Sequence, residues 1–258
     1  MRKVYGLLVT LMLACVACQW QLKPNDTDNN ETRVSIQRYD RIESLYLTTG
    51  DRSAMQQMNT YFPMQTRTLI EDVLRLGQVN DPEINAKFLH FFQDSTLQAM
   101  LQTVQQQYSN IEDLNDELTN AFDRLKEDLP SLIVPDIYTQ IGSFDQSIIV
   151  SGRSLGICLD KYLGADYPFY QTHYSDQQRR MMVRQMIVPD CLSFYILSLF
   201  PIPQKAKTQQ ERDSHIGCIQ WLVNRATGRD VFQNEFVRAA GQLIEQDSRM
   251  TIEQLLRR

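Results

Sequence analysis

Apolar residues recur at every third or fourth position through much of residues 33–129, and this spacing predicts amphipathic helices. Residues 81–83 read DPE, which is typical of a helix start: a capping aspartate, a proline at the first helical position and an acid in the first turn. A capping-box pattern at residues 109–112 predicts the start of a long helix that ends at Pro130. The apolar stripe of that helix comprises Ile111, Leu114, Leu118, Phe122, Leu125 and Leu129.

The pattern changes after Pro130, where short apolar runs replace the helical spacing. Residues 132–134 and 147–150 are rich in β-branched side chains, which favours strands, and residues 155–159 form a third apolar run. The sequence SGR at residues 151–153 predicts a turn between the last two strands. These runs predict a small sheet in the middle of the chain.

Beyond Gly164 the chain becomes helical again. Residues 175–178 and 208–211 each have capping-box spacing. Residues 191–200 form an apolar run that contains two serines and is too short to cross a bilayer, so we interpret it as a buried helix. Together these patterns predict one α+β domain over residues 33–258, mostly helical, with a small central β-sheet.

The N-terminal residues have the pattern of an export signal. A short positively charged start precedes an uncharged apolar stretch, residues 4–17, which is shorter than the ~18–20 residues that span a bilayer. The stretch ends in a small residue followed by a cysteine, which resembles a bacterial lipobox. We therefore predict a lipoprotein signal peptide over residues 1–18, with palmitate-type lipid on Cys18. Cys15 is the alternative acceptor, and a plain cleaved signal or an uncleaved anchor stays open.

Residues 19–32 are polar and lack a repeating apolar position, and we predict that they form a tether between membrane and domain. Lipid on an N-terminal cysteine would hold the protein at a membrane surface rather than across the membrane. The net charge of −5 argues against a nucleic-acid partner. Three further cysteines lie beside apolar residues, and we expect them to be buried free thiols: Cys158, Cys191 and Cys218.

The sequence offers few candidates for catalysis or metal binding. The chain has three histidines, none close to another in sequence, so a local histidine metal site is excluded and we expect no metal or other cofactor. Residues 152–156 match G-x-S-x-G, and Asp190 and His215 follow Ser154 in the order of a hydrolase triad. The match lies between two predicted strands rather than at a strand-to-helix turn. We therefore interpret it as a hairpin turn, assign no catalytic residue and expect no enzymatic activity.

Acidic and aromatic residues gather after this turn. Asp160, Asp166 and Asp190 could hold a cation or move a proton, but their spacing matches no metal-binding loop, so we expect helix capping and surface pairing. Aromatic residues surround Pro168. They predict either an interaction or glycan-binding surface or local packing of a loop, and they are Tyr162, Tyr167, Phe169, Tyr170 and Tyr174.

Residues 155–170 contain LDKYLG at positions 159–164, and this segment resembles a motif of the gliding-motility-associated lipoprotein B (GldB-like) family of Bacteroidota. The sequence MIVPD at residues 186–190 resembles the element that follows it in the family, and QRYD at residues 37–40 resembles an earlier one. These matches keep the family's order over residues 34–203. The distinctive positions are Asp160, Tyr162, Leu163, Gly164, Tyr170, Pro189 and Asp190.

The resemblance implies a lipid-anchored protein of the outer membrane that faces the periplasm. It also implies contacts with other envelope proteins, among them components of secretion or gliding-motility machinery. The family is distantly similar to zincin metallopeptidases, in which the helix after this motif carries two histidines four residues apart. Residues 188–193 read VPDCLS and contain no histidine, so the resemblance implies a degenerate, non-catalytic zincin-like scaffold. A periplasmic module that binds glycans or peptides is the alternative function, and a hydrolase is the third.

Overall fold

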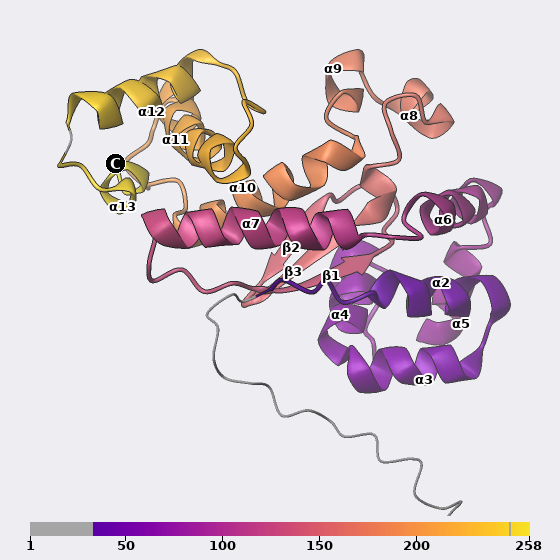
Figure 1. Ribbon diagram of the computed structural model, residues 1–258. Helices are drawn as coiled ribbons and strands as arrows, with labels where there is room; N and C mark the ends of the chain where they lie inside the picture. Colours follow the sequence, from indigo (N-terminus) through magenta and orange to yellow (C-terminus); the bar gives the residue numbers. More distant parts are fainter. Residues whose placement is uncertain (1–32, 248) are drawn as a thin grey trace, which may run out of the picture. The chain divides into compact units, whose positions relative to one another are not determined.

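The computed structural model describes residues 33–247 and 249–258. The predicted signal peptide, its lipidation cysteine Cys18 (alternatively Cys15) and the predicted tether lie outside these residues. The described residues form one compact unit, Arg33–Arg258, in which helices are arranged around a small three-stranded sheet (Figure 1). The predicted fold class, mostly helical α+β with a small sheet, is confirmed.

Helices precede and follow the sheet along the chain. Before the sheet lie α2 (Tyr39–Thr49), α3 (Arg52–Tyr61), α4 (Pro63–Arg67), the π-helix η1 (Thr68–Val73), α5 (Ile84–Phe91), α6 (Ser95–Gln107) and α7 (Glu112–Asp128). The sheet consists of β1 (Asp136–Gln140), β2 (Ile148–Ser151) and β3 (Ser154–Cys158). After the sheet lie the 3-10 helix η2 (Leu159–Lys161), α8 (Pro168–His173), α9 (Asp176–Arg179), the 3-10 helix η3 (Arg184–Met186), α10 (Ile187–Leu199), α11 (Gln209–Thr227), α12 (Glu235–Gln246) and α13 (Ile252–Leu256).

The predicted long amphipathic helix is confirmed as α7, and its apolar stripe is buried. The capping box predicted at residues 109–112 is wrong. Asn110 takes the capping role, since its Oδ1 accepts a hydrogen bond from Glu112 N at 2.8 Å. The Glu112 carboxylate, which the box would turn back toward the helix start, instead binds Arg33 and Asn115.

The other predicted helix starts agree more closely with the structure. The capping boxes predicted at residues 175–178 and 208–211 are both present, at the starts of α9 and α11. The start predicted at Asp81 lies slightly early, because α5 begins at Ile84. The Asp81 carboxylate accepts a hydrogen bond from Glu83 N at 2.9 Å and so stabilises the turn before the helix.

The sheet has the strand order β1-β3-β2, with β1 parallel and β2 antiparallel to β3. The strands β2 and β3 form the predicted hairpin, and Gly152 in its turn has a left-handed φ of +58°. The strand predicted at residues 132–134 is wrong, since β1 begins at Asp136. Asp136 pairs with Ser154, so residues 132–134 would lie beside the hairpin turn, where β3 offers no ladder partner.

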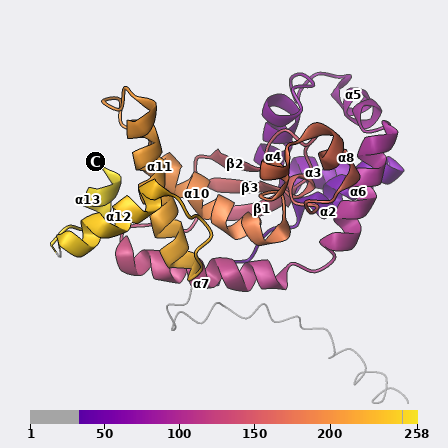
Figure 2. The ribbon, with the colours of Figure 1, turned by 90° about the horizontal axis from the view of Figure 1, so that it is seen from above.

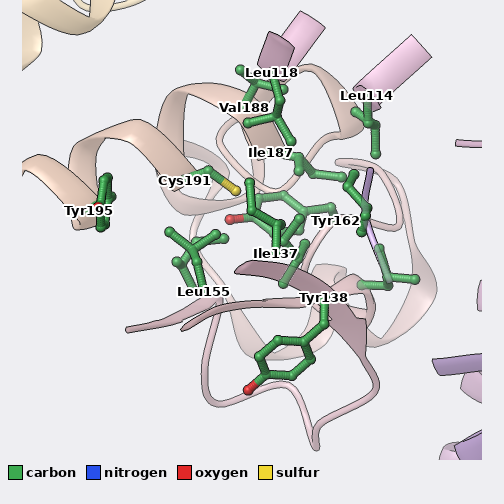
Figure 3. Close-up of a cluster of buried hydrophobic side chains, with 14 of the residues drawn as sticks. Leu114, Leu118, Ile137, Tyr138, Leu155, Tyr162, Ile187, Val188, Cys191 and Tyr195 are labelled. Carbon is green, nitrogen blue, oxygen red and sulfur yellow. The ribbon is translucent and has the colours of Figure 1, made fainter. Parts of the chain in front are cut away.

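The two faces of the sheet pack against different helices. Figure 3 shows Ile137 and Leu155 on the face toward Cys191 of α10, and α7 packs against α10 in turn. Tyr138 points to the opposite face, as alternation along a strand requires. Its ring lies edge-on to Tyr39 of α2, with 6.3 Å between the ring centroids.

Gly156 is required by this arrangement. It lies opposite Tyr138 in the ladder, and a Cβ at this position would come within 2.6 Å of the Tyr138 hydroxyl oxygen. A side chain at Gly156 would therefore displace the ring. Gly156, the last glycine of the G-x-S-x-G match, is therefore needed to make room for the Tyr138 ring in the sheet.

The predicted helix over residues 191–200 is confirmed as α10, although Phe194 on its outer side is exposed. No helix in residues 33–247 and 249–258 is both long and apolar enough to cross a membrane. The thiols expected to be buried and free are confirmed for Cys158, Cys191 and Cys218.

The C-terminal helices α11, α12 and α13 pack together after α10 (Figure 2). Gly217 lets α12 approach α11 closely, since a Cβ there would lie 2.4 Å from the Cβ of Phe236. Of these helices, α11 also packs against α7, which links the C-terminal helices to the helical layer over the sheet.

Candidate functional site

Asp160 connects the ends of the two parallel strands. It follows β3 within η2, and its side chain is fully buried. The carboxylate accepts hydrogen bonds from Gly142 N at 2.7 Å and from Phe144 N at 2.8 Å, both in the β1–β2 loop (residues 141–147). Burial raises the pKa of this carboxyl, and the two backbone donors oppose the shift. Asp160 therefore holds the β1–β2 loop and is closed to solvent.

Phe144 in the same loop is held by residues that follow Asp160. The Lys161 ammonium donates to Phe144 O at 2.5 Å, and the Tyr174 hydroxyl donates to the same oxygen at 2.8 Å. Phe144 has φ +69°, a left-handed conformation that is strained for a residue other than glycine. Its ring stacks on Phe169 of α8, with the centroids 4.0 Å apart. These contacts hold the loop in a conformation that it would not adopt alone.

Tyrosine hydroxyls fix the backbone of the LDKYLG segment. The Tyr108 hydroxyl donates to Tyr162 O at 2.6 Å. The Tyr170 hydroxyl donates to Asp160 O and accepts a hydrogen bond from Leu163 N at 3.2 Å. Tyr108 and Tyr170 are buried, so their hydroxyls satisfy polar backbone groups that water does not reach.

Gly164 and Pro189 occupy positions that suit their backbones. Gly164 has φ +106°, which favours glycine, and its N–H donates to Met182 O at 3.0 Å. Pro189 lies buried in the first turn of α10, where a missing N–H leaves no helical hydrogen bond unmade. Both residues therefore have conformational roles in the fold.

Tyr162 and Asp190 meet in space although 28 positions separate them in sequence, and the Tyr162 hydroxyl donates to Asp190 Oδ2 at 2.8 Å. Burial raises the pKa of Asp190 to about 6, so this carboxyl can exchange a proton near neutral pH. Both side chains line a cavity of about 270 Å³, together with Lys161, Met181 and Met182. The cavity is smaller than the ~300–1,000 Å³ that ligand sites usually occupy.

The hydrolase triad is not assembled. Ser154 opens β3 beside the hairpin turn, Asp190 accepts its hydrogen bond from Tyr162, and His215 Nε2 donates to Phe200 O at 2.8 Å. In the described part of the chain no hydrogen bond joins Ser154 to Asp190 or to His215. The same residues contain no group of three or more His, Cys, Asp and Glu side chains arranged to hold a metal ion.

The aromatic residues around Pro168 divide into two groups, and part of the predicted loop is the short helix α8. Tyr162 and Tyr170 are buried, and Tyr162 lines the small cavity beside Asp190. Asp166, beside them, is exposed. The half-buried aromatics of this segment are Tyr167, Phe169 and Tyr174.

A second buried acidic group, on α2, was not predicted. Glu43 Oε2 accepts a hydrogen bond from Ile141 N at 2.8 Å, at the start of the β1–β2 loop, while Oε1 is buried and has no hydrogen-bond partner among the described residues. Burial raises the pKa of Glu43 well above its ordinary value, because it disfavours the charged form of the carboxyl. The nearby Asp40 is paired with Arg38 at 2.7 Å. The QRYD sequence at residues 37–40, which resembles a family element, was the sequence feature that could have drawn attention to Asp40 and Glu43.

The family model described as gliding motility protein GldB matches residues 20–212, which is three quarters of the chain. The chain belongs to the GldB family. None of the curated proteins matches it, and none of the solved structures does. The family is one of gliding-motility-associated lipoproteins, which places the protein at the cell envelope.

All of the elements that surround Asp160 lie within the residues that the GldB family model matches. The sheet, η2, α8 and α10 all lie within residues 20–212, as does the α2 acidic group. Most of α11 and all of α12 and α13 follow the match. The buried hydrogen bonds of the LDKYLG segment therefore belong to the GldB part of the chain.

Proposed function

We propose that this GldB-family protein is a non-catalytic lipoprotein, anchored through Cys18 to the periplasmic face of the outer membrane. It acts through contacts with other envelope proteins, including components of secretion or gliding-motility machinery. The observation that carries the proposal is the burial of Asp160, whose two carboxylate oxygens are both occupied by backbone N–H groups. Asp160, the acid of the LDKYLG segment, therefore has a structural role and is not accessible to a substrate.

The proposed absence of catalysis is supported at Ser154 and on α10. The G-x-S-x-G match is a hairpin whose Gly156 makes room for Tyr138. The sequence of α10 has no histidine at the place where a zincin would carry two. A fluorophosphonate probe for active serines tests this on the full chain. We expect no more labelling than in Ser154→Ala, and labelling that disappears in this variant would overturn the proposal.

The contact role is tested by crosslinking intact cells and purifying the tagged full-length protein from their membranes. We expect defined envelope proteins to be recovered, and fewer of them with Asp160→Ala, because the β1–β2 loop loses its buried acceptor. Asp166→Ala, which removes an exposed acid nearby, should recover the same proteins as the unchanged chain. Circular dichroism checks that Asp160→Ala stays folded. Recovery of no specific protein from unchanged cells would contradict the contact role.

The anchor is tested with labelled palmitate and membrane fractionation. Cys18→Ser should abolish incorporation of the label and release the protein from the membrane fraction, whereas Cys15→Ser should change neither. The reverse result would assign the lipid to Cys15. Incorporation into neither form would contradict the lipoprotein anchor.

Ligand binding near the same loop is the second candidate function, supported by a cavity of about 600 Å³. Phe91, Phe144 and Phe169 line it, and Arg75 lies at its edge. Arg75 and Phe144 both have a positive φ, of 54° and 69°. Such strain in residues other than glycine clusters at binding sites, and the π-helix η1 that precedes Arg75 is a further feature of functional sites. We propose a peptide or glycan of the periplasm as the ligand of this cavity.

Thermal denaturation with peptidoglycan fragments tests this second function. A ligand that binds the folded state raises the melting temperature by mass action. We expect the increase to disappear in Phe169→Ala and to persist in Phe194→Ala, which removes an exposed aromatic side chain on α10. No increase with the unchanged chain, or an equal increase in Phe169→Ala, would argue against binding at this cavity.

A further inference from the structure

A separate cavity of about 410 Å³ lies among the C-terminal helices, where α11, α12 and α13 pack together (Figure 2). Its walls come from residues 203–206, one side of α11, Leu243 of α12 and Leu255 of α13. Pro203, Ala206 and the two leucines give it an apolar floor. Most of the lining lies beyond the GldB match, so this cavity is independent of the function proposed above.

The wall on α11 is well fixed. His215 is buried, and its Nε2 donates to Phe200 O at 2.8 Å, which holds the segment after α10 against α11. Cys218 lies one helical turn further along and also lines the cavity, with 7% of its surface exposed. The cavity therefore has a preformed shape rather than one that a ligand would have to create.

The charges at the cavity are unbalanced. Lys205 and Arg258 are exposed lining residues, and within residues 33–247 and 249–258 neither side chain has an ion-pair or hydrogen-bond partner. Glu211 is the acid of the lining, and its Oε2 accepts hydrogen bonds from the backbone N–H groups of Lys207 and Thr208. The lining therefore carries two cations and one anion, an excess of positive charge in a chain whose net charge is −5.

Cys218 and Arg258 both line the cavity, so the Arg258 guanidinium and the apolar floor border the same space. Burial raises the pKa of the Cys218 thiol, and the positive charge of Arg258 opposes this shift. An apolar group attached to an anion bound by Arg258 can therefore pack on the floor.

We propose that this cavity binds an amphiphilic anion: one aliphatic chain that ends in a carboxylate or a phosphate. The chain packs on Ala206, Leu243 and Leu255, and the anionic headgroup is bound by Lys205 and Arg258. The volume lies near the lower end of the ~300–1,000 Å³ range of ligand sites, so it accommodates one chain of medium length. A fatty acid and a single-chain phospholipid share this chemistry.

Equilibrium dialysis of the purified, unlipidated full chain against radiolabelled decanoate tests the proposal. We expect saturable binding to one site below the micelle-forming concentration, with competition by decyl phosphate but not by decanol. The double variant Lys205→Ala/Arg258→Ala should weaken binding by about ten-fold or more. Lys207→Ala removes an exposed cation outside the lining and should leave binding unchanged.

Two further measurements locate the ligand. Ser214→Trp places a large ring in the cavity and should abolish decanoate binding, and bound decanoate should slow alkylation of Cys218 by N-ethylmaleimide. Stronger competition by decyl phosphate than by unlabelled decanoate would assign phosphate-headed lipids, and the reverse would assign fatty acids. Equal competition by decanol would overturn the role of the two cations. No saturable binding, or binding that Ser214→Trp leaves intact, would overturn the site.

Discussion

Asp160 is fully buried and Asp190 is half-buried, and their surroundings compensate for the loss of water to different degrees. Asp160 accepts two backbone hydrogen bonds, from Gly142 and Phe144, whereas Asp190 accepts one from the Tyr162 hydroxyl. Burial raises the pKa of both carboxyls, because it disfavours the charged form. The two residues should therefore respond differently to replacement by the uncharged amide.

Asp160→Asn should lower the free energy of unfolding by about 2–3 kcal/mol, because one of the two backbone donors then faces an amide NH₂ that cannot accept. Urea denaturation followed by circular dichroism measures this change. Asp166→Asn, at an exposed position, should change it by less than about 0.5 kcal/mol. Equal effects of the two substitutions would contradict the role of Asp160 in holding the β1–β2 loop.

Asp190→Asn should change the pH dependence of stability. The pKa of Asp190 is raised from 3.8 to about 6, so the unfolded chain loses this proton first as the pH rises. The native protein therefore loses stability between about pH 4 and pH 6, and Asn, which does not ionise, avoids this loss. We expect the variant to be more stable by about 1–3 kcal/mol at pH 7.5 and nearly unchanged at pH 4. Urea denaturation at both pH values measures the difference, and a gain that is the same at both would exclude the titration of Asp190 as its cause.

At the scale of elements, the pairing of β1 with β3 depends on one glycine. Gly156 lies opposite Tyr138, whose ring passes across the space that a Cβ would fill. The same ring contacts Tyr39 of α2, so the position of a helix is coupled to the absence of a side chain on a strand. This coupling is invisible in the sequence, because 18 positions separate the paired residues of β1 and β3.

Gly156→Ala should destabilise the protein by about 1–3 kcal/mol, since the added methyl group overpacks the sheet against the Tyr138 ring. Thermal or urea denaturation measures the loss. In a Tyr138→Ala background, where the ring is absent, the same substitution should cost much less, and the difference is the coupling energy of the pair. Strict additivity of the two substitutions would show that the predicted contact does not limit this position.

For the whole molecule, the buried core of the described residues extends from Val34 to Leu256. Val34 and Ile36 lie at its beginning, and their N–H groups donate to Thr119 and Asn115 of α7. The compact unit Arg33–Arg258 therefore contains the hydrophobic contacts and the buried hydrogen bonds that stabilise it.

A chain that lacks residues 1–32 should fold and melt cooperatively within ~2 °C of the full chain, because it keeps the compact unit Arg33–Arg258 with its buried core. Deletion of residues 1–38 also removes Val34 and Ile36 and their bonds to α7, so the melting temperature should fall by at least ~5 °C. Thermal denaturation followed by circular dichroism compares the two. Equal melting temperatures would show that this segment contributes nothing to the core.

The amino-acid sequence by itself determined the local structure and the family. Helical spacing and capping boxes identified α7, α9 and α11, because these signals depend on side chains within one or two turns. The LDKYLG segment indicated the GldB family, which the family match over residues 20–212 shows. The same local signals failed at residues 109–112. There the Glu112 carboxylate binds Arg33 and Asn115 instead of turning back to the backbone at the helix start.

Tertiary structure alone decided which residues meet. The strand expected at residues 132–134 had the right composition, but a ladder needs a partner, and β3 begins only after the hairpin turn, at Ser154. The same is true of Tyr162 with Asp190, of Asp160 with the β1–β2 loop, and of the cations Lys205 and Arg258 around one apolar cavity. Each of these contacts joins distant positions, so its energy depends on the geometry of the folded chain rather than on any local pattern of residues.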